Sequence, residues 1–178
     1  FSYGAKQALS EVTFSLSAGS YYALLGPNGA GKSTLFSILC QLLQPQSGSV
    51  TVNGISAAKK PRQVLKQVGM VFQQPTLDLD LSVEQNLAYH ASLHGLSNAY
   101  TKQRINEELQ RFALSERRKD KVRSLNGGHR RRVEIARALL HQPAILLLDE
   151  ATVGLDQSTR DTINEHLRQL CSDSGIAI

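Results

Sequence analysis

Residues 26–33 form a glycine-rich loop that constrains the fold more than any other segment of this sequence. They fit the pattern G-x-x-x-x-G-K-[ST] without a mismatch. The apolar run Tyr21–Leu25 precedes the loop, and apolar residues at helical spacing follow from Lys32. A glycine-rich loop between a strand and a helix binds phosphate, because its backbone N–H groups and the helix N-terminus attract anions. The pattern therefore predicts an α/β fold built around a phosphate-binding loop.

Two side chains of this loop have predicted roles. Lys32 would reach the β- and γ-phosphates of a nucleotide, and Ser33 would place its hydroxyl on Mg²⁺. An ordinary glycine-rich turn with an incidental lysine is the alternative, and the flanking strand and helix disfavour it. We expect a nucleotide-binding set made of Gly26, Pro27, Asn28, Gly29, Ala30, Gly31, Lys32, Ser33 and Thr34.

An acidic pair follows the apolar run Ile145–Leu148. A strand that is apolar at every position is typical of a central parallel strand covered on both faces, and its carboxyl end would deliver the pair beside the phosphate loop. Asp149 would hold the magnesium shell. Glu150 would polarise the attacking water as a general base.

Hydrophobic periodicity predicts alternating strands and helices along the chain. Asn53-Gly54 adds a hairpin turn, which predicts a small antiparallel element. The fold class is therefore α/β: a P-loop NTPase core with a parallel central sheet, a small antiparallel β subdomain and a helical subdomain. Strands are expected at 12–16, 21–25, 50–52, 68–72, 144–148 and from 176, and helices at 32–43, 127–140 and 158–171, with a helical insert at about 75–125.

The composition fits one globular domain, residues 1–178, with 41% hydrophobic and 20% charged residues. No apolar stretch approaches the roughly 18 residues that a spanning helix needs, so we expect a soluble chain, and any membrane role would run through a partner. The charge of +5 is scattered, which disfavours direct nucleic-acid binding. Cys40 and Cys171 lie far apart, which indicates a reducing cytosol. The missing initiator Met and the apolar end at Ile178 lead us to expect truncation at both ends.

A second glycine pair narrows the choice among phosphate-loop proteins. It belongs to the segment Leu125-Asn126-Gly127-Gly128-His129, which resembles the Leu-Ser-Gly-Gly-Gln signature of ATP-binding cassette (ABC) proteins. The following residues, 130–139, are equally similar to that family. Two glycines at the start of a helix make an anion site. The resemblance implies that this site caps the γ-phosphate held by the opposite subunit.

Three further positions match the family one by one. Tyr3 is similar to the aromatic residue that stacks on adenine, with an ordinary exposed tyrosine as the alternative. Gln73 is similar to the glutamine that touches the metal and the water and links to the transport subunit. Asp156 lies in a segment similar to the loop that couples the two nucleotide sites. The resemblance thus implies catalytic residues Lys32, Gln73 and Glu150, metal ligands Ser33, Gln73 and Asp149, and the cofactors ATP and Mg²⁺.

Departures from the family pattern also carry information. Asn126 and His129 replace the usual Ser and Gln, which would alter γ-phosphate binding, and Ala151 replaces a frequent Pro. Residues 73–82 together with 126–132 resemble a bacterial subgroup associated with quinoprotein (PQQ-dependent) alcohol oxidation. The resemblance further implies a γ-phosphate-contacting histidine within about ten residues after Ile178.

The implied function is the Mg²⁺-dependent ATPase subunit of an ABC transporter. A second cassette, forming a homodimer, and a transmembrane permease are the expected partners, with no direct nucleic-acid partner. The expected location is the cytoplasm, peripheral on the inner face of the cell membrane. Two alternatives stay open: a soluble cassette ATPase that acts on ribosomes or DNA, and a regulatory cassette that binds ATP with little turnover.

The remaining histidines support a simpler interpretation. His90 and His94 lie four residues apart on a predicted helix and could form half a metal site. No third ligand is evident in the sequence, so we expect a surface pair. His141 and His166 have no partner in the sequence.

Overall fold

The computed structural model of the protein describes residues 1–178, and a parallel sheet lies at its centre. Strand β5 (Val68–Val71) pairs with β6 (Ile145–Leu148) in the register Val68↔Ile145. On the other side of β6, the Leu146 N–H donates to the Ala177 carbonyl at 2.8 Å. The α/β fold with a parallel central sheet, expected from the sequence, is confirmed.

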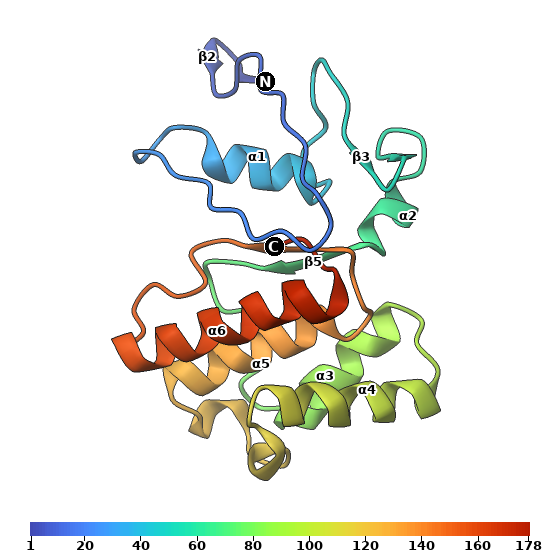
Figure 1. The fold of residues 1–178 in the computed structure, drawn as a ribbon, viewed down its shortest axis with the longest axis vertical. Coiled ribbons are helices and arrows are strands. Elements are labelled where there is room, and N and C mark those ends of the chain that lie inside the picture. The colour runs from blue at the N-terminus through green and yellow to red at the C-terminus, as the bar shows by residue number, and fades with distance from the viewer.

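Helices cover both faces of this sheet (Figure 1). Helix α1 (Lys32–Leu39) lies on one face, and α5 (Gly127–Leu139) and α6 (Gln157–Ser174) lie on the other. Successive residues of a strand point to opposite faces. Accordingly, Leu146 is buried in the large core cluster on the α5 side, whereas Leu147 belongs to the small cluster below α1.

Two short hairpins complete the α1 side of the molecule. The first pairs β1 (Ser2–Tyr3) with β2 (Lys6–Gln7), and the second pairs β3 (Thr51–Val52) with β4 (Ile55–Ser56). In the second hairpin Asn53 and Gly54 have φ values of 48° and 74°. Two positive φ values in a two-residue loop match the twist of the flanking strands, so the expected Asn-Gly turn forms. Helix α2 (Pro61–Leu65) follows.

Residues between β5 and α5 are mainly helical. They form α3 (Val83–Leu93), α4 (Asn98–Arg111) and two 3₁₀ turns, η1 (Ser115–Arg117) and η2 (Val122–Ser124). Buried Arg104 on α4 pairs with buried Glu108 and donates from Nε to the Leu140 carbonyl at 3.2 Å. This bond anchors α4 to the end of α5. No helix of the chain combines the length and the apolar character needed to cross a bilayer.

Two predicted strands, at 12–16 and 21–25, do not form. Phe14 and Leu25 are 51% and 88% exposed. A strand needs a neighbouring backbone, and the only ladder bonds here join residues 20–22 to Ile178, the last residue of the sequence. The predicted helix at 32–43 also ends early, at Leu39, because the chain turns through Gln41 at a φ of 58°.

Candidate functional site

The glycine-rich loop owes its path to two glycines with left-handed backbone. Gly29 and Gly31 have φ values of 83° and 90°, a region that other residues rarely adopt. At Gly31 a Cβ atom would lie 2.4 Å from the Ala8 carbonyl oxygen and 2.8 Å from Leu9. Only glycine therefore lets the start of α1 approach the N-terminal segment this closely.

Lys32 folds back over this loop. Its Nζ atom donates hydrogen bonds to the carbonyls of Gly26 at 2.7 Å and Pro27 at 2.9 Å. The ammonium group is thereby fixed against the loop, at the N-terminus of α1. The loop thus combines a fixed cation, a helix N-terminus and glycine backbone, which together favour an anion.

A cavity of about 280 Å³ lies in front of the loop. Three separate segments line it: the N-terminal hairpin, the glycine-rich loop with the start of α1, and the acidic pair after β6. Its lining residues are Tyr3, Lys6, Gln7, Ala8, Asn28, Gly29, Gly31, Lys32, Ser33, Thr34, Asp149 and Glu150. A cation and two carboxylates thus share one cavity with a loop suited to phosphate.

The acidic pair lies where two parallel strands end. The Asp149 N–H donates to the Val71 carbonyl at 2.9 Å, which holds the pair at the carboxyl edge of the sheet. Burial raises the pKa of Asp149, the neighbouring charge of Glu150 raises it further, and Lys32 opposes both. Glu150 accepts a 2.8 Å hydrogen bond from Nε2 of Gln73, although Gln73 does not line the cavity.

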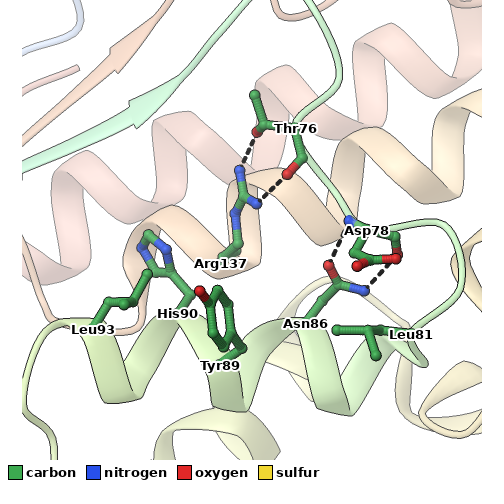
Figure 2. A pocket seen from close by; sticks show the side chains of 8 residues that line it. All are labelled: Thr76, Asp78, Leu81, Asn86, Tyr89, His90, Leu93 and Arg137. Carbon is green, nitrogen blue, oxygen red and sulfur yellow. Dashed lines mark hydrogen bonds between the residues drawn. The ribbon is translucent and has the colours of Figure 1, made fainter.

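Helix α5 holds the segment around Gln73, residues 72–76, in place. Arg131 donates to the Phe72 carbonyl at 2.9 Å, and Glu134, only 3% exposed, accepts the Thr76 N–H at 2.9 Å. Arg137 donates to the Thr76 carbonyl at 2.9 Å (Figure 2). Sequence reasoning missed these residues. Their three-residue spacing on a helix was the available signal, because it places charged side chains on one face.

A second cavity, of about 430 Å³, lies beside this anchor rather than at the glycine-rich loop. Thr76 and Arg137 line it on one side and His90 and Tyr89 of α3 on the other (Figure 2). Size alone therefore does not identify the chemical site. The smaller cavity is the better candidate because it gathers the cation, the carboxylates and the phosphate-type loop.

The second glycine pair forms a separate cluster with Asp156. Asn126 caps α5 by accepting the His129 N–H at 2.8 Å, and Asp156 caps α6 by accepting the Thr159 N–H at 2.9 Å. A Cβ atom on Gly128 would lie 2.9 Å from Cγ2 of Thr159, so the two helix starts are in close contact. The hydrogen bond from the Thr159 N–H is the main reason that the pKa of exposed Asp156 is lowered. Neither Asp156 nor residues 125–129 line the cavity with Lys32.

The expected surface pair of His90 and His94 is wrong. His141, which follows α5, lies with them, and ligand atoms of all three are within 4.8 Å of one another. Folding brings together residues almost 50 positions apart in the sequence, which the spacing alone could not reveal. Burial lowers the pKa of His90 to about 3 and that of His141 to about 4, and it also lowers the pKa of His94.

Known proteins resemble this chain in both sequence and fold. The sequence profile of the family described as ABC transporter matches residues 9–153. The linearmycin resistance ATP-binding protein LnrL of Bacillus subtilis (strain 168) is 38% identical over 176 residues, which cover 99% of this chain and 56% of LnrL. The chain thus spans little more than half the length of the curated relatives that it matches.

Two solved structures share the fold. The cbiO1 protein of Clostridium perfringens, part of the ABC transporter complex cbiONQ, superposes with a TM-score of 0.88 at 30% identity, covering 97% of this chain and 70% of cbiO1. The ATP-binding cassette MJ0796, solved as a dimer in a post-hydrolysis state bound to ADP and Pi, superposes with a TM-score of 0.83 at 30% identity. This second match covers 96% of this chain and 77% of MJ0796.

Proposed function

The chain belongs to the ABC transporter family, and on that premise we propose that it binds and hydrolyses ATP to drive a membrane transporter. One observation carries the proposal: the cavity in which the glycine-rich loop, Lys32, Asp149 and Glu150 meet. The triphosphate would lie along the loop, with its β- and γ-phosphates at Lys32. The adenine would stack on Tyr3, which is 52% exposed at the edge of the same cavity.

The donors around the cavity suit Mg²⁺. Ser33 and Asp149 line the cavity. The Gln73 side chain does not line it but donates a hydrogen bond to Glu150, which does. Hydroxyl, carboxylate and amide oxygens are the hard ligands that Mg²⁺ prefers. We assign Ser33, Asp149 and Gln73 as the residues that hold it. When bound, Mg²⁺ neutralises charge on the β- and γ-phosphates.

Glu150 is the proposed general base. Its carboxylate faces the cavity and accepts a hydrogen bond from Gln73, which fixes its orientation and leaves acceptor capacity for a water proton. A base in this position would activate the water that attacks the γ-phosphate. Arg131 donates to the Gln73 carbonyl and Glu134 accepts from the Thr76 N–H, and these two bonds keep this pair aligned.

The second glycine pair is proposed to act on the nucleotide of another subunit. Residues 125–129 and Asp156 do not line the cavity of their own chain, although Gly127 and Gly128 open a helix suited to an anion. Two chains arranged head to tail would each complete the other's site. Closing and opening of this dimer would drive a permease at the inner face of the membrane.

Two finer assignments are part of the proposal. Residues 75–125, which contain α3 and α4, would form the helical subdomain of a single cassette. The sequences at 73–82 and 126–132 favour the subgroup associated with quinoprotein alcohol oxidation.

Replacement of Lys32 by Ala tests the nucleotide site. Removing the ammonium group deletes charge-assisted bonds to the phosphates, so we expect the affinity for a fluorescent ATP analogue to fall by about a hundredfold or more. Lys59→Ala, an exposed lysine outside the cavity, is the control and should leave the affinity unchanged. Equal affinities of Lys32→Ala and the wild type would remove the assignment of the loop.

A further inference from the structure

Three histidines form a compact cluster away from the nucleotide cavity. His90 lies on α3 and His94 caps the C-terminus of that helix, with ring centroids 4.7 Å apart. His141 comes from the chain between α5 and β6. Its ring is stacked on that of His94 at 3.9 Å and lies 6.3 Å from that of His90. All three side chains are partly buried, so their environment is shaped by the fold.

The ring nitrogens of this cluster are almost free of hydrogen bonds. The single bond joins Nε2 of His141 to the Val68 carbonyl at 3.3 Å. A carbonyl can only accept, so Nε2 carries the hydrogen and Nδ1 keeps its lone pair. That Nδ1 atom is buried and has no hydrogen-bond partner. A buried acceptor without a partner is costly and calls for a ligand that can accept its lone pair.

A metal ion supplies that ligand. Metal-binding histidines commonly donate their second ring N–H to a backbone carbonyl, which fixes the tautomer, and His141 makes this bond to Val68. His90 and His94, four residues apart at the C-terminal end of α3, add two nitrogens. Three imidazoles with an open fourth position form a zinc-type site. Hard ions such as Mg²⁺ need oxygen ligands instead.

We propose that His90, His94 and His141 form a binding site for Zn²⁺ or a similar borderline transition-metal ion. The ligand atoms lie within 4.8 Å of one another, whereas nitrogens around a tetrahedral zinc ion are about 3.4 Å apart. Binding therefore closes the cluster and turns the His94 ring out of its stack on His141.

The charges nearby limit the strength of the site. Lys66 acts on His94 and Arg137 acts on His90, and both oppose an added cation. Arg137 donates a hydrogen bond to the Thr76 carbonyl, and Glu134 offsets part of its charge. The set also lacks an anionic ligand. The site therefore favours metals that bind imidazole strongly.

Bound metal would join separate parts of the molecule. It would tie α3 to the chain between α5 and β6, on the side of α3 that also borders the 430 Å³ cavity at His90. The structure would gain a cross-link between the helices of residues 75–125 and the sheet. Zinc should therefore raise the melting temperature of the protein by mass action.

Zinc titration of the chelator-treated chain tests the proposal. The probe is Zn²⁺ alone, followed by competition with a fluorescent chelator in a buffer that contains Mg²⁺. We expect one saturable zinc ion per chain and a rise in melting temperature. His94→Gln and His141→Gln should each weaken binding at least about tenfold and abolish the rise, because each removes a ligand.

His166→Gln is the matched control, because His166 lies on α6 outside the cluster. It should bind zinc like the wild type. His94 is the least buried member, so His94→Gln decides the outcome if His141→Gln does not fold. The proposal is overturned if the wild type shows no saturable binding. It is also overturned if His94→Gln retains wild-type affinity, or if His166→Gln loses as much affinity as His94→Gln.

Discussion

Glu150 has a strained backbone, and its carboxylate accepts a hydrogen bond from Gln73. Its φ of 48° lies in the left-handed region, which costs a residue with a Cβ atom about 1 kcal/mol or more. The neighbouring Asp149 N–H bond to Val71 and the Gln73 bond to its carboxylate hold it there. Strain of this kind persists where surrounding bonds over-determine the conformation, and here it aims a carboxylate into the cavity.

Glu150→Gln separates binding from turnover. The amide keeps the shape of the side chain but cannot accept a proton, so we expect ATP affinity to stay within about twofold and turnover to fall about a hundredfold or more. The variant should accumulate as an ATP-bound dimer. Phosphate release and size-exclusion chromatography with ATP and Mg²⁺ measure the two effects.

Glu11→Gln is the control for this experiment, because Glu11 is exposed, also has a positive φ of 51°, and lies outside the cavity. It should hydrolyse ATP like the wild type. Undiminished hydrolysis by Glu150→Gln, together with a monomer in chromatography, would exclude Glu150 as the base.

Single residues differ in how far their positions could be foreseen. The phosphate-loop pattern predicted a loop followed by a helix that begins at Lys32, and the local sequence was sufficient because the loop and helix are contiguous. The strand predicted before the loop, at 21–25, does not form. His141 could not be placed beside His94, because their contact depends on how α3 packs against the end of α5. The same reason hid the bond that the Thr76 N–H donates to Glu134, which spans 58 positions.

At the scale of elements, the sequence predicted a strand correctly where the strand that pairs with it lies close by in the sequence. The Asn53-Gly54 turn and the two flanking strands lie within six residues, and the hairpin forms as expected. The alternating residues at 12–16 have no neighbouring backbone to pair with, and residues 12–15 remain exposed. Strand β6 forms because β5 pairs with all four of its residues and Ala177 bonds on the other side.

The close contact between the starts of α5 and α6 predicts that a larger residue at position 128 destabilises the fold. A Cβ atom at position 128 would lie 2.9 Å from Thr159, whose hydroxyl is held by Asp156 at 2.7 Å. Gly128→Ala should therefore lower the free energy of unfolding by about 1–3 kcal/mol, the usual cost of overpacking. Urea unfolding followed by circular dichroism measures this change.

Gly127→Ala is the matched control. A Cβ atom there meets nothing closer than Leu155 at 4.0 Å, and Ala has the higher helix propensity. Its free energy of unfolding should equal or exceed that of the wild type. Equal values for the two alanine variants would show that Thr159 moves away without cost and that the helix starts are not tightly coupled.

At the scale of the whole molecule, the sheet separates the two predicted anion sites. Helix α1, with the phosphate loop, lies on one face, and α5, with the second glycine pair at its start, lies on the other (Figure 1). The small cavity is lined without any residue of 125–129. If both helix starts bind phosphate as proposed, they do not share one nucleotide within a single chain, which favours a head-to-tail dimer.

Restoring the usual signature residues tests this arrangement. The double variant Asn126→Ser, His129→Gln should preserve the fold, because Ser caps a helix as well as Asn does and the cap uses only the backbone N–H of residue 129. If the signature contacts the partner's nucleotide, the ATP affinity of the dilute monomer stays unchanged. The hydrolysis rate at dimer-forming concentration should rise about tenfold, the effect of one added hydrogen bond of about 1.4 kcal/mol in the transition state. Fluorescent-nucleotide titration and phosphate release, each measured across a dilution series, separate the two quantities. A changed affinity in the monomer would mean that residues 126 and 129 touch the ATP of their own chain, and the head-to-tail arrangement would then lose its main support.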